Sequence, residues 1–276
     1  MTLIDEPPCK LQKLDDNLAE FKVLPLLDSS ILSPYVPTTS FYALELNDKK
    51  LIGIVIKLVN ELPERLRHLK RVGKEGKILI AETIEESEVV YEKLKELGIS
   101  KTCLTEIQVP AIKPVTRRQF EYAKSLWSTS FNADKEVENL LSGEFLTPEL
   151  KNYISKYSEM ASSIECIAVQ NKEILCTGSS NPGPLRHPVM EMVRNLPKRE
   201  ANADNYLGTG CDIFLKNEPC AMCAMALVHF RVKRIFFNSK SSNGVLSSGG
   251  WQLHLEPAIN HHYQVFHVVS DKSENF

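Results

Sequence analysis

Residues 219–223 read Pro219-Cys220-Ala221-Met222-Cys223 and place two cysteines three positions apart. The apolar run that continues to Phe230 contains no glycine or proline, which predicts a helix over residues 220–230. Side chains at positions i and i+3 share one helix face, and the helix dipole favours thiolates at the N-terminal end. Both sulfurs are therefore expected to point the same way from one first turn.

A histidine completes a candidate metal site. His187 follows a loop rich in glycine and proline at residues 178–184 and begins a predicted helix over residues 187–195. Two thiolates and one imidazole suit tetrahedral zinc, and three protein ligands leave a fourth position open, as in catalytic sites. A redox Cys-x-x-Cys pair is the alternative, because it also lies at a helix start after a strand. The histidine favours zinc on His187, Cys220 and Cys223.

The spacing resembles the signature of the zinc-dependent nucleoside and nucleobase deaminases, His-x-Glu followed by Pro-Cys-x-x-Cys. The resemblance covers about residues 115–270, and the second half of the signature is intact. It implies an α/β fold like that of cytidine deaminases, a mixed sheet flanked by helices, with Zn²⁺ on the three ligands. In this family zinc activates a water that displaces an amine from the base, and the glutamate moves the protons.

The first half of the signature departs from the family. His187-Pro188-Val189 has valine where the family has glutamate. General acid–base catalysis contributes about 10²–10⁴ in rate, and valine has no ionisable group to supply it. We therefore expect no catalytic residue in this chain. Glu191 is a poor substitute, because two helical positions turn it about 200° away from Val189; we expect it to be solvated or paired with a cation.

The degenerate motif His187-Pro188-Val189-Met190 is similar to that of one branch of the family, the non-catalytic subunits of heterodimeric eukaryotic tRNA deaminases. Those enzymes convert adenosine at the wobble position to inosine. The segments 249–254 and 260–266 add to the resemblance. It implies a pseudoenzyme that scaffolds a catalytic deaminase subunit, through apolar helices such as residues 222–230, and helps to bind tRNA. From the pattern alone, burial inside the fold explains that helix equally well.

Two other functions stay open at this point. One is a self-sufficient deaminase of a free nucleoside with an unrecognised base, which Val189 opposes and which gives residues 1–110 no role. The other is a zinc-stabilised RNA-binding adaptor that is unconnected with deamination.

The first third of the chain predicts a smaller α+β domain over residues 1–110, before the deaminase-like domain over residues 111–276. Strand and helix patterns follow the ferredoxin-like order β-α-β-β-α-β. The elements are expected at residues 41–46, 49–62, 65–72, 78–83, 85–97 and 102–109. Pro110 and Pro114 bracket an extended connection and mark the boundary. By resemblance, this domain helps to present tRNA.

Six cations lie within thirteen residues of this domain, namely Arg65, Arg67, Lys70, Arg71, Lys74 and Lys77. On the predicted strand over residues 65–72, the three arginines would project from one face. We predict contacts from these side chains to the tRNA backbone, which should weaken with salt. A solvated edge strand explains the run equally well.

Composition sets the remaining limits. The 276 residues carry a formal charge of −2, so a local patch must hold any nucleic acid. The longest apolar run, at residues 51–59, is far shorter than the roughly 20 residues of a membrane span. No secretory signal pattern is present at the N-terminus, and seven cysteines are an odd number for a disulfide scaffold. We expect an intracellular protein of the nucleus or cytoplasm, with reduced thiols, and structural roles for His254, His261 and His262.

Overall fold

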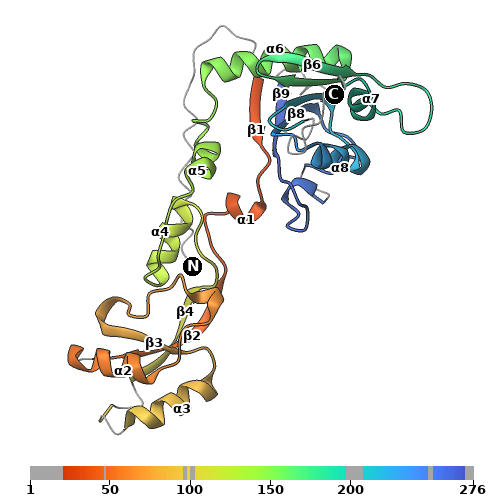
Figure 1. Cartoon of the computed structure of the whole chain (residues 1–276). Coiled ribbons are helices and arrows are strands. Elements are labelled where there is room, and N and C mark those ends of the chain that lie inside the picture. The colour runs from red at the N-terminus through yellow and green to blue at the C-terminus, as the bar shows by residue number, and fades with distance from the viewer. Residues whose placement is uncertain are drawn as a thin grey trace, which may run out of the picture. The chain divides into compact units, whose positions relative to one another are not determined.

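The computed structural model describes residues 21–46, 48–95, 98–99, 103–196, 208–247 and 251–270. The chain forms two compact units (Figure 1). The N-terminal unit comprises residues 27–147, and the C-terminal unit combines residues up to Leu26 with those from Pro148 onward. None of the described helices is both long enough and apolar enough to cross a membrane.

The C-terminal unit is built on a six-stranded mixed sheet with the order β1-β9-β8-β7-β5-β6. Its strands span Phe21–Pro25 (β1), Cys166–Gln170 (β5), Glu173–Gly178 (β6), Asp212–Asn217 (β7), Arg234–Ser239 (β8) and Gln264–Ser270 (β9). Strands β7, β8 and β9 are parallel, whereas the other pairings are antiparallel. Its helices are α6 (Pro148–Ile164), α7 (Pro188–Arg194) and α8 (Ala221–Phe230).

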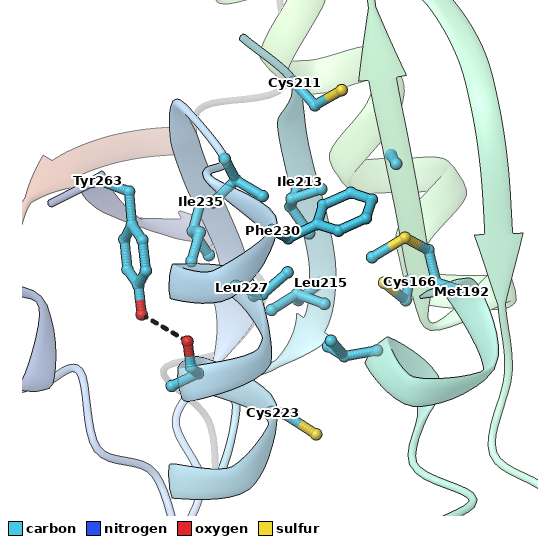
Figure 2. Packing of buried hydrophobic residues seen from close by; sticks show 14 of the residues in the cluster. Cys166, Met192, Cys211, Ile213, Leu215, Cys223, Leu227, Phe230, Ile235 and Tyr263 are labelled. Atoms are coloured by element: carbon cyan, nitrogen blue, oxygen red, sulfur yellow. Dashed lines mark hydrogen bonds between the residues drawn. The ribbon is translucent and has the colours of Figure 1, made fainter. Parts of the chain in front are cut away.

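One face of this sheet is covered by α7 and α8. Ile213 and Leu215 of β7 and Ile235 of β8 pack against Leu227 and Phe230 of α8 in a buried layer (Figure 2). Helix α8 is apolar around most of its circumference, and the sheet buries only one side of it. Its N-terminal end lies directly after β7, which places Cys220 at the carboxyl end of a central strand.

The opposite face carries an aromatic layer. Phe214 stacks on Phe236 at a ring distance of 4.8 Å, and Phe236 stacks on Phe266 at 5.0 Å. Tyr153 and Tyr157 of α6 contact Phe214 from above. Alternation of neighbouring residues between the two faces therefore builds a three-layer α/β/α unit, and it confirms the predicted mixed sheet flanked by helices.

The N-terminal unit contains a three-stranded antiparallel sheet with the order β3-β2-β4. The strands are Thr38–Glu45 (β2), Lys77–Ala81 (β3) and Leu104–Pro110 (β4). The helices are Ser29–Leu32 (α1), Ile52–Leu58 (α2), Ile84–Lys95 (α3), Arg117–Leu126 (α4) and Lys135–Ser142 (α5). Val55 of α2 and Leu94 of α3 pack on Ile78 and Ile80 of β3, so both helices cover one side of this sheet.

The predicted strand over residues 65–72 is wrong, and with it the ferredoxin-like strand order among the described residues. This segment starts with a 3₁₀ turn at Glu64–Leu66 and continues through single bridges from Leu69 to Thr129 and from Val72 to Ile78. Leu66 and Leu69 are both buried, and a spacing of three suits a turn better than the two-residue period of a strand. The helix predicted over residues 49–62 is also shorter, because α2 ends at Leu58.

The division into units differs from the boundary expected at residue 110. Helix α4 belongs to the N-terminal unit, because the side-chain amide of Gln119 donates to the Ser30 carbonyl at 2.7 Å. The indole of Trp127 likewise donates to the Lys70 carbonyl at 2.7 Å. In the opposite sense, β1 pairs with β9 and is part of the C-terminal sheet. The sequence pattern predicts no element at β1.

Candidate metal centre

The predicted ligands come together at the starts of two helices. His187 precedes the first residue of α7, Cys220 precedes the first residue of α8, and Cys223 lies in the first turn of α8. The Nδ1 atom of His187 lies 3.4 Å from the Cys220 sulfur and 3.5 Å from the Cys223 sulfur. Zinc bonds of about 2.0–2.3 Å in a tetrahedral arrangement separate nitrogen and sulfur ligands by about 3.5 Å. The donor set and its spacing therefore fit zinc.

Close packing of α7 on β6 places His187. A Cβ atom at Gly178 of β6 would lie 2.1 Å from the Pro188 carbonyl oxygen and 2.4 Å from the Met192 nitrogen. Only glycine permits this approach of helix to strand. Pro188 occupies the first turn of α7, where its missing N–H costs no hydrogen bond. The two helix starts thus converge with their positive dipole ends toward the sulfurs.

Burial differs among the three ligands. The His187 side chain is exposed, Cys220 is half-buried, and Cys223 is buried. Burial, and then the neighbouring Cys220 sulfur, raise the pKa of the Cys223 thiol to about 12. A coordinated dication favours the thiolate and would overcome this effect.

A cavity of about 200 Å³ adjoins the three ligands, and Val189 lies in its wall with 2% exposure. Pockets for small-molecule ligands have volumes of roughly 300–1,000 Å³, so this cavity is small. The residue at the position of the family's glutamate is therefore apolar and packed. It offers the cavity a methyl surface and no proton.

Glu191 is held away from any proton-transfer role. Its carboxylate accepts hydrogen bonds from Asn181 at 3.1 Å and Arg186 at 3.1 Å, and it pairs with Arg194. Removal from water raises the pKa of Glu191, but these donors outweigh that effect and lower it overall. The predicted pairing with a cation is confirmed, whereas the side chain is buried instead of solvated. Glu191 does not line the cavity.

Two other carboxylates line the cavity, and each is bound to a loop. Glu165 accepts a hydrogen bond from the Ser180 backbone nitrogen. Glu218 accepts bonds from the backbone nitrogens of Leu246 at 2.8 Å and Ser247 at 2.7 Å. Sequence reasoning missed Glu218, and its place directly before Pro219 is the one local signal that could have drawn attention to it.

Three of the six cations predicted to contact tRNA bind other groups of the protein. Arg65 pairs with Glu82, and Lys77 lies 3.5 Å from Glu45. The Arg71 guanidinium donates to the Asn60 carbonyl, and burial lowers its pKa. The remaining three side chains are exposed, namely Arg67, Lys70 and Lys74.

The three C-terminal histidines are structural, as predicted. His254 Nε2 lies 2.9 Å from the Leu26 carbonyl oxygen, and His261 Nε2 lies 2.7 Å from that of Val232. His262 Nδ1 lies 3.0 Å from the His254 carbonyl oxygen. Among the described residues, the three-residue group placed to hold a metal ion is His187, Cys220 and Cys223.

Residues 146–239 match the family model of the cytidine and deoxycytidylate deaminase zinc-binding region, which contains all three candidate ligands. Over these residues the chain is similar to this deaminase family. A human relative named "Probable inactive tRNA-specific adenosine deaminase-like protein 3" is 28% identical over 98% of this chain and 96% of its own. The Saccharomyces cerevisiae relative, named tRNA-specific adenosine deaminase subunit TAD3, is 26% identical over 76% of each chain.

A solved structure from a study of A-to-I editing by tRNA deaminases at the wobble position also matches. It is 20% identical, with a TM-score of 0.33, and the match covers 43% of this chain and 96% of that one.

Proposed function

We propose that this chain is a non-catalytic, zinc-binding subunit of a tRNA adenosine deaminase. It scaffolds a separate catalytic subunit and helps to bind tRNA, and the pair converts adenosine at the anticodon wobble position to inosine with release of ammonia. The names of the full-length relatives support this assignment. Such a protein would act in the nucleus, the cytoplasm or both.

The observation that carries the proposal is the state of the carboxylates around the metal centre. Val189 occupies the position from which a glutamate would move protons. The two glutamates that line the cavity, Glu165 and Glu218, bind backbone groups of loops. Among the described residues, the candidate metal-binding triad therefore has no free carboxylate beside it, which supports a proton-transfer group supplied by another chain.

Zinc in this subunit has a structural role in our proposal. Bound to His187, Cys220 and Cys223, zinc would join the start of α7 to the start of α8. Because the metal holds both helix starts in place, its binding free energy would contribute to the stability of the fold. Both helices then present their outer sides in a fixed arrangement.

The outer sides of these helices supply a surface for the catalytic subunit. Met222 and Met225 of α8 and Met190 and Val193 of α7 are only partly buried, although they adjoin the main core. Methionine is enriched in protein interfaces because its flexible side chain fits many partner shapes. A deaminase subunit that covers this surface would bury the apolar side chains that the sheet leaves partly exposed.

Contacts to tRNA are assigned to the basic segment of the N-terminal unit. Of the six predicted cations, Arg67, Lys70 and Lys74 are the best placed, since the side chains of Arg65, Arg71 and Lys77 already bind protein groups. Lysine and arginine side chains that are free to reach phosphates hold nucleic acid without reading its sequence.

The test is to express the full chain with and without a candidate catalytic deaminase and to assay zinc content and wobble inosine together. We expect zinc in the isolated chain, a stable complex with the partner, and inosine only in the complex. Release of ammonia from tRNA by the isolated chain, purified free of any partner, would contradict the proposal.

A further inference from the structure

Glu218 is a buried carboxylate that the proposed reaction does not use. It lines the cavity beside the metal centre, directly before Pro219 and Cys220, and is 4% exposed. A buried carboxylate is costly unless hydrogen-bond donors surround it. The donors that surround Glu218 therefore indicate what it does.

All the donors come from one loop, residues 241–247. Oε1 accepts from the backbone nitrogens of Leu246 at 2.8 Å and Ser247 at 2.7 Å. Oε2 accepts from the Ser247 hydroxyl at 2.8 Å and from the Ser241 backbone nitrogen at 3.4 Å. The loop wraps the carboxylate with donors, and hydrogen bonds to an ionised acceptor are stronger than neutral ones.

The same loop is joined to the backbone around Cys220. Gly244 forms a bridge with Cys220, and the Val245 nitrogen donates to the Pro219 carbonyl at 3.3 Å. A Cβ atom at Gly244 would lie 2.2 Å from the Glu218 carboxyl carbon, so glycine is required for this approach. Loop, carboxylate and metal ligand therefore form one connected group.

We propose that Glu218 is a positioning residue that clamps the loop 241–247 against the metal centre, and that zinc on Cys220 in turn orders this loop. The second half of this inference rests on the zinc site of the proposed function. Ser241 and Asn243 of the loop line the cavity, so the clamp sets the shape of one cavity wall. The loop also holds the segment that begins at Leu253, because the Leu253 nitrogen donates to the Val245 carbonyl at 2.9 Å.

Amide hydrogen exchange on the zinc-loaded full chain tests the clamp at Leu246 and Ser247. In Glu218→Ala, exchange at both amides should be roughly tenfold to a hundredfold faster, the range for loss of a hydrogen bond to a charged group. Glu218→Gln should show a smaller increase, because its amide oxygen still accepts both bonds. Glu173→Ala removes an exposed carboxylate from β6 and should leave both amides unchanged.

Gly244→Ala approaches the clamp from the loop side and should also speed exchange at the two amides. If Glu218→Ala yields no folded protein, Glu218→Gln and Gly244→Ala carry the test. Exchange at wild-type rates in every folded variant of Glu218 and Gly244 would overturn the clamp.

Zinc removal tests the coupling of metal to loop. A chelator that strips zinc from the wild-type chain should speed exchange at Leu246, and an unchanged rate after complete removal would overturn the coupling. The zinc content of the wild-type chain is measured separately. A chain that binds no zinc contradicts the metal site of the proposed function, whereas the Glu218 and Gly244 variants still decide whether the clamp exists.

Discussion

His254 Nε2 lies 2.9 Å from the carbonyl oxygen of Leu26, and 228 positions of sequence separate the two residues. Because a carbonyl only accepts, the imidazole donates through Nε2 and is held in that tautomer when neutral. His254 is 3% exposed, and its Nδ1 has no hydrogen-bond partner among the described residues. A neutral histidine thus anchors Leu26, which is the last residue of the chain before it enters the N-terminal unit.

This anchor predicts a loss of stability in mild acid. Burial lowers the pKa of His254, so the unfolded chain binds a proton more readily than the folded one. The stabilisation is complete above the unfolded pKa of about 6.5 and declines as the pH falls through the folded value. We expect the Tm to decrease between pH 7 and pH 5, measured by calorimetry.

A substitution separates His254 from the other histidines. His254→Gln should make the Tm less dependent on pH, whereas His229→Gln changes an exposed histidine on α8 and should not. Part of the dependence should remain, because burial also lowers the pKa of His267. An identical pH profile for His254→Gln and the wild type would contradict the assignment.

Gly178→Ala should disturb the metal centre without touching a ligand. The added methyl group would lie 2.1 Å from the Pro188 carbonyl, which pushes α7 and hence His187 away from the cysteines. Overpacking of this kind costs about 1–3 kcal/mol. We expect a lower zinc-to-protein ratio and a lower Tm. Gly53→Ala is the control and should retain both, because no side chain and no backbone beyond its own helix turn lies within 4 Å of the added carbon.

Removal of a ligand should destabilise the C-terminal unit. Cys223→Ser replaces the most buried ligand and should abolish stoichiometric zinc. A loss of about 2 kcal/mol would lower the Tm by about 4–8 °C in a domain of this size. Cys103→Ser, in the N-terminal unit, is the matched control. Chelation should lower the Tm of the wild type and leave that of Cys223→Ser unchanged; equal effects on both would show that zinc binds elsewhere.

Charge reversal at Arg67 and Lys70 should weaken tRNA binding by the complex. Each phosphate contact that is lost reduces the dependence of affinity on salt by roughly one counterion. We expect several-fold weaker binding for the double variant at about 100 mM salt, with a shallower salt dependence, in a filter-binding or fluorescence titration. Lys93→Glu, at an exposed cation on α3, is the control for a charge reversal outside this segment and is compared with each single reversal. Unchanged affinity after reversal would leave this segment as a solvated surface.

The convergence of the three candidate ligands could be predicted from sequence because its signals are local. Cys220, Cys223 and His187 each lie at a helix start, and the proline positions mark those starts directly. The role of Glu218 could not be predicted, because its donors lie more than twenty positions away in a loop with no regular pattern. The residues next to Glu218 in the sequence do not indicate which loop its carboxylate binds.

The N-terminal unit shows the limit of periodic patterns. Residues 65–72 alternate charge and leucine closely enough to predict a strand, yet the buried Leu66 and Leu69 anchor a turn. Strand β1 escaped prediction for another reason. Its five residues are specified by pairing with β9, at the far end of the sequence, and not by any pattern of their own.

The pairing of β1 with β9 means that the C-terminal unit is not continuous along the chain. Its sheet takes a strand from before Leu26 and five more after Pro148, and the N-terminal unit is inserted between them. A fragment that starts at residue 148 would therefore leave β9 without a partner strand on its β1 side along Phe266–Ser270, beside the apolar side chains of Phe266 and Val268. An open strand edge of that kind recruits other chains, so we expect such a fragment to aggregate unless residues 21–26 are supplied with it.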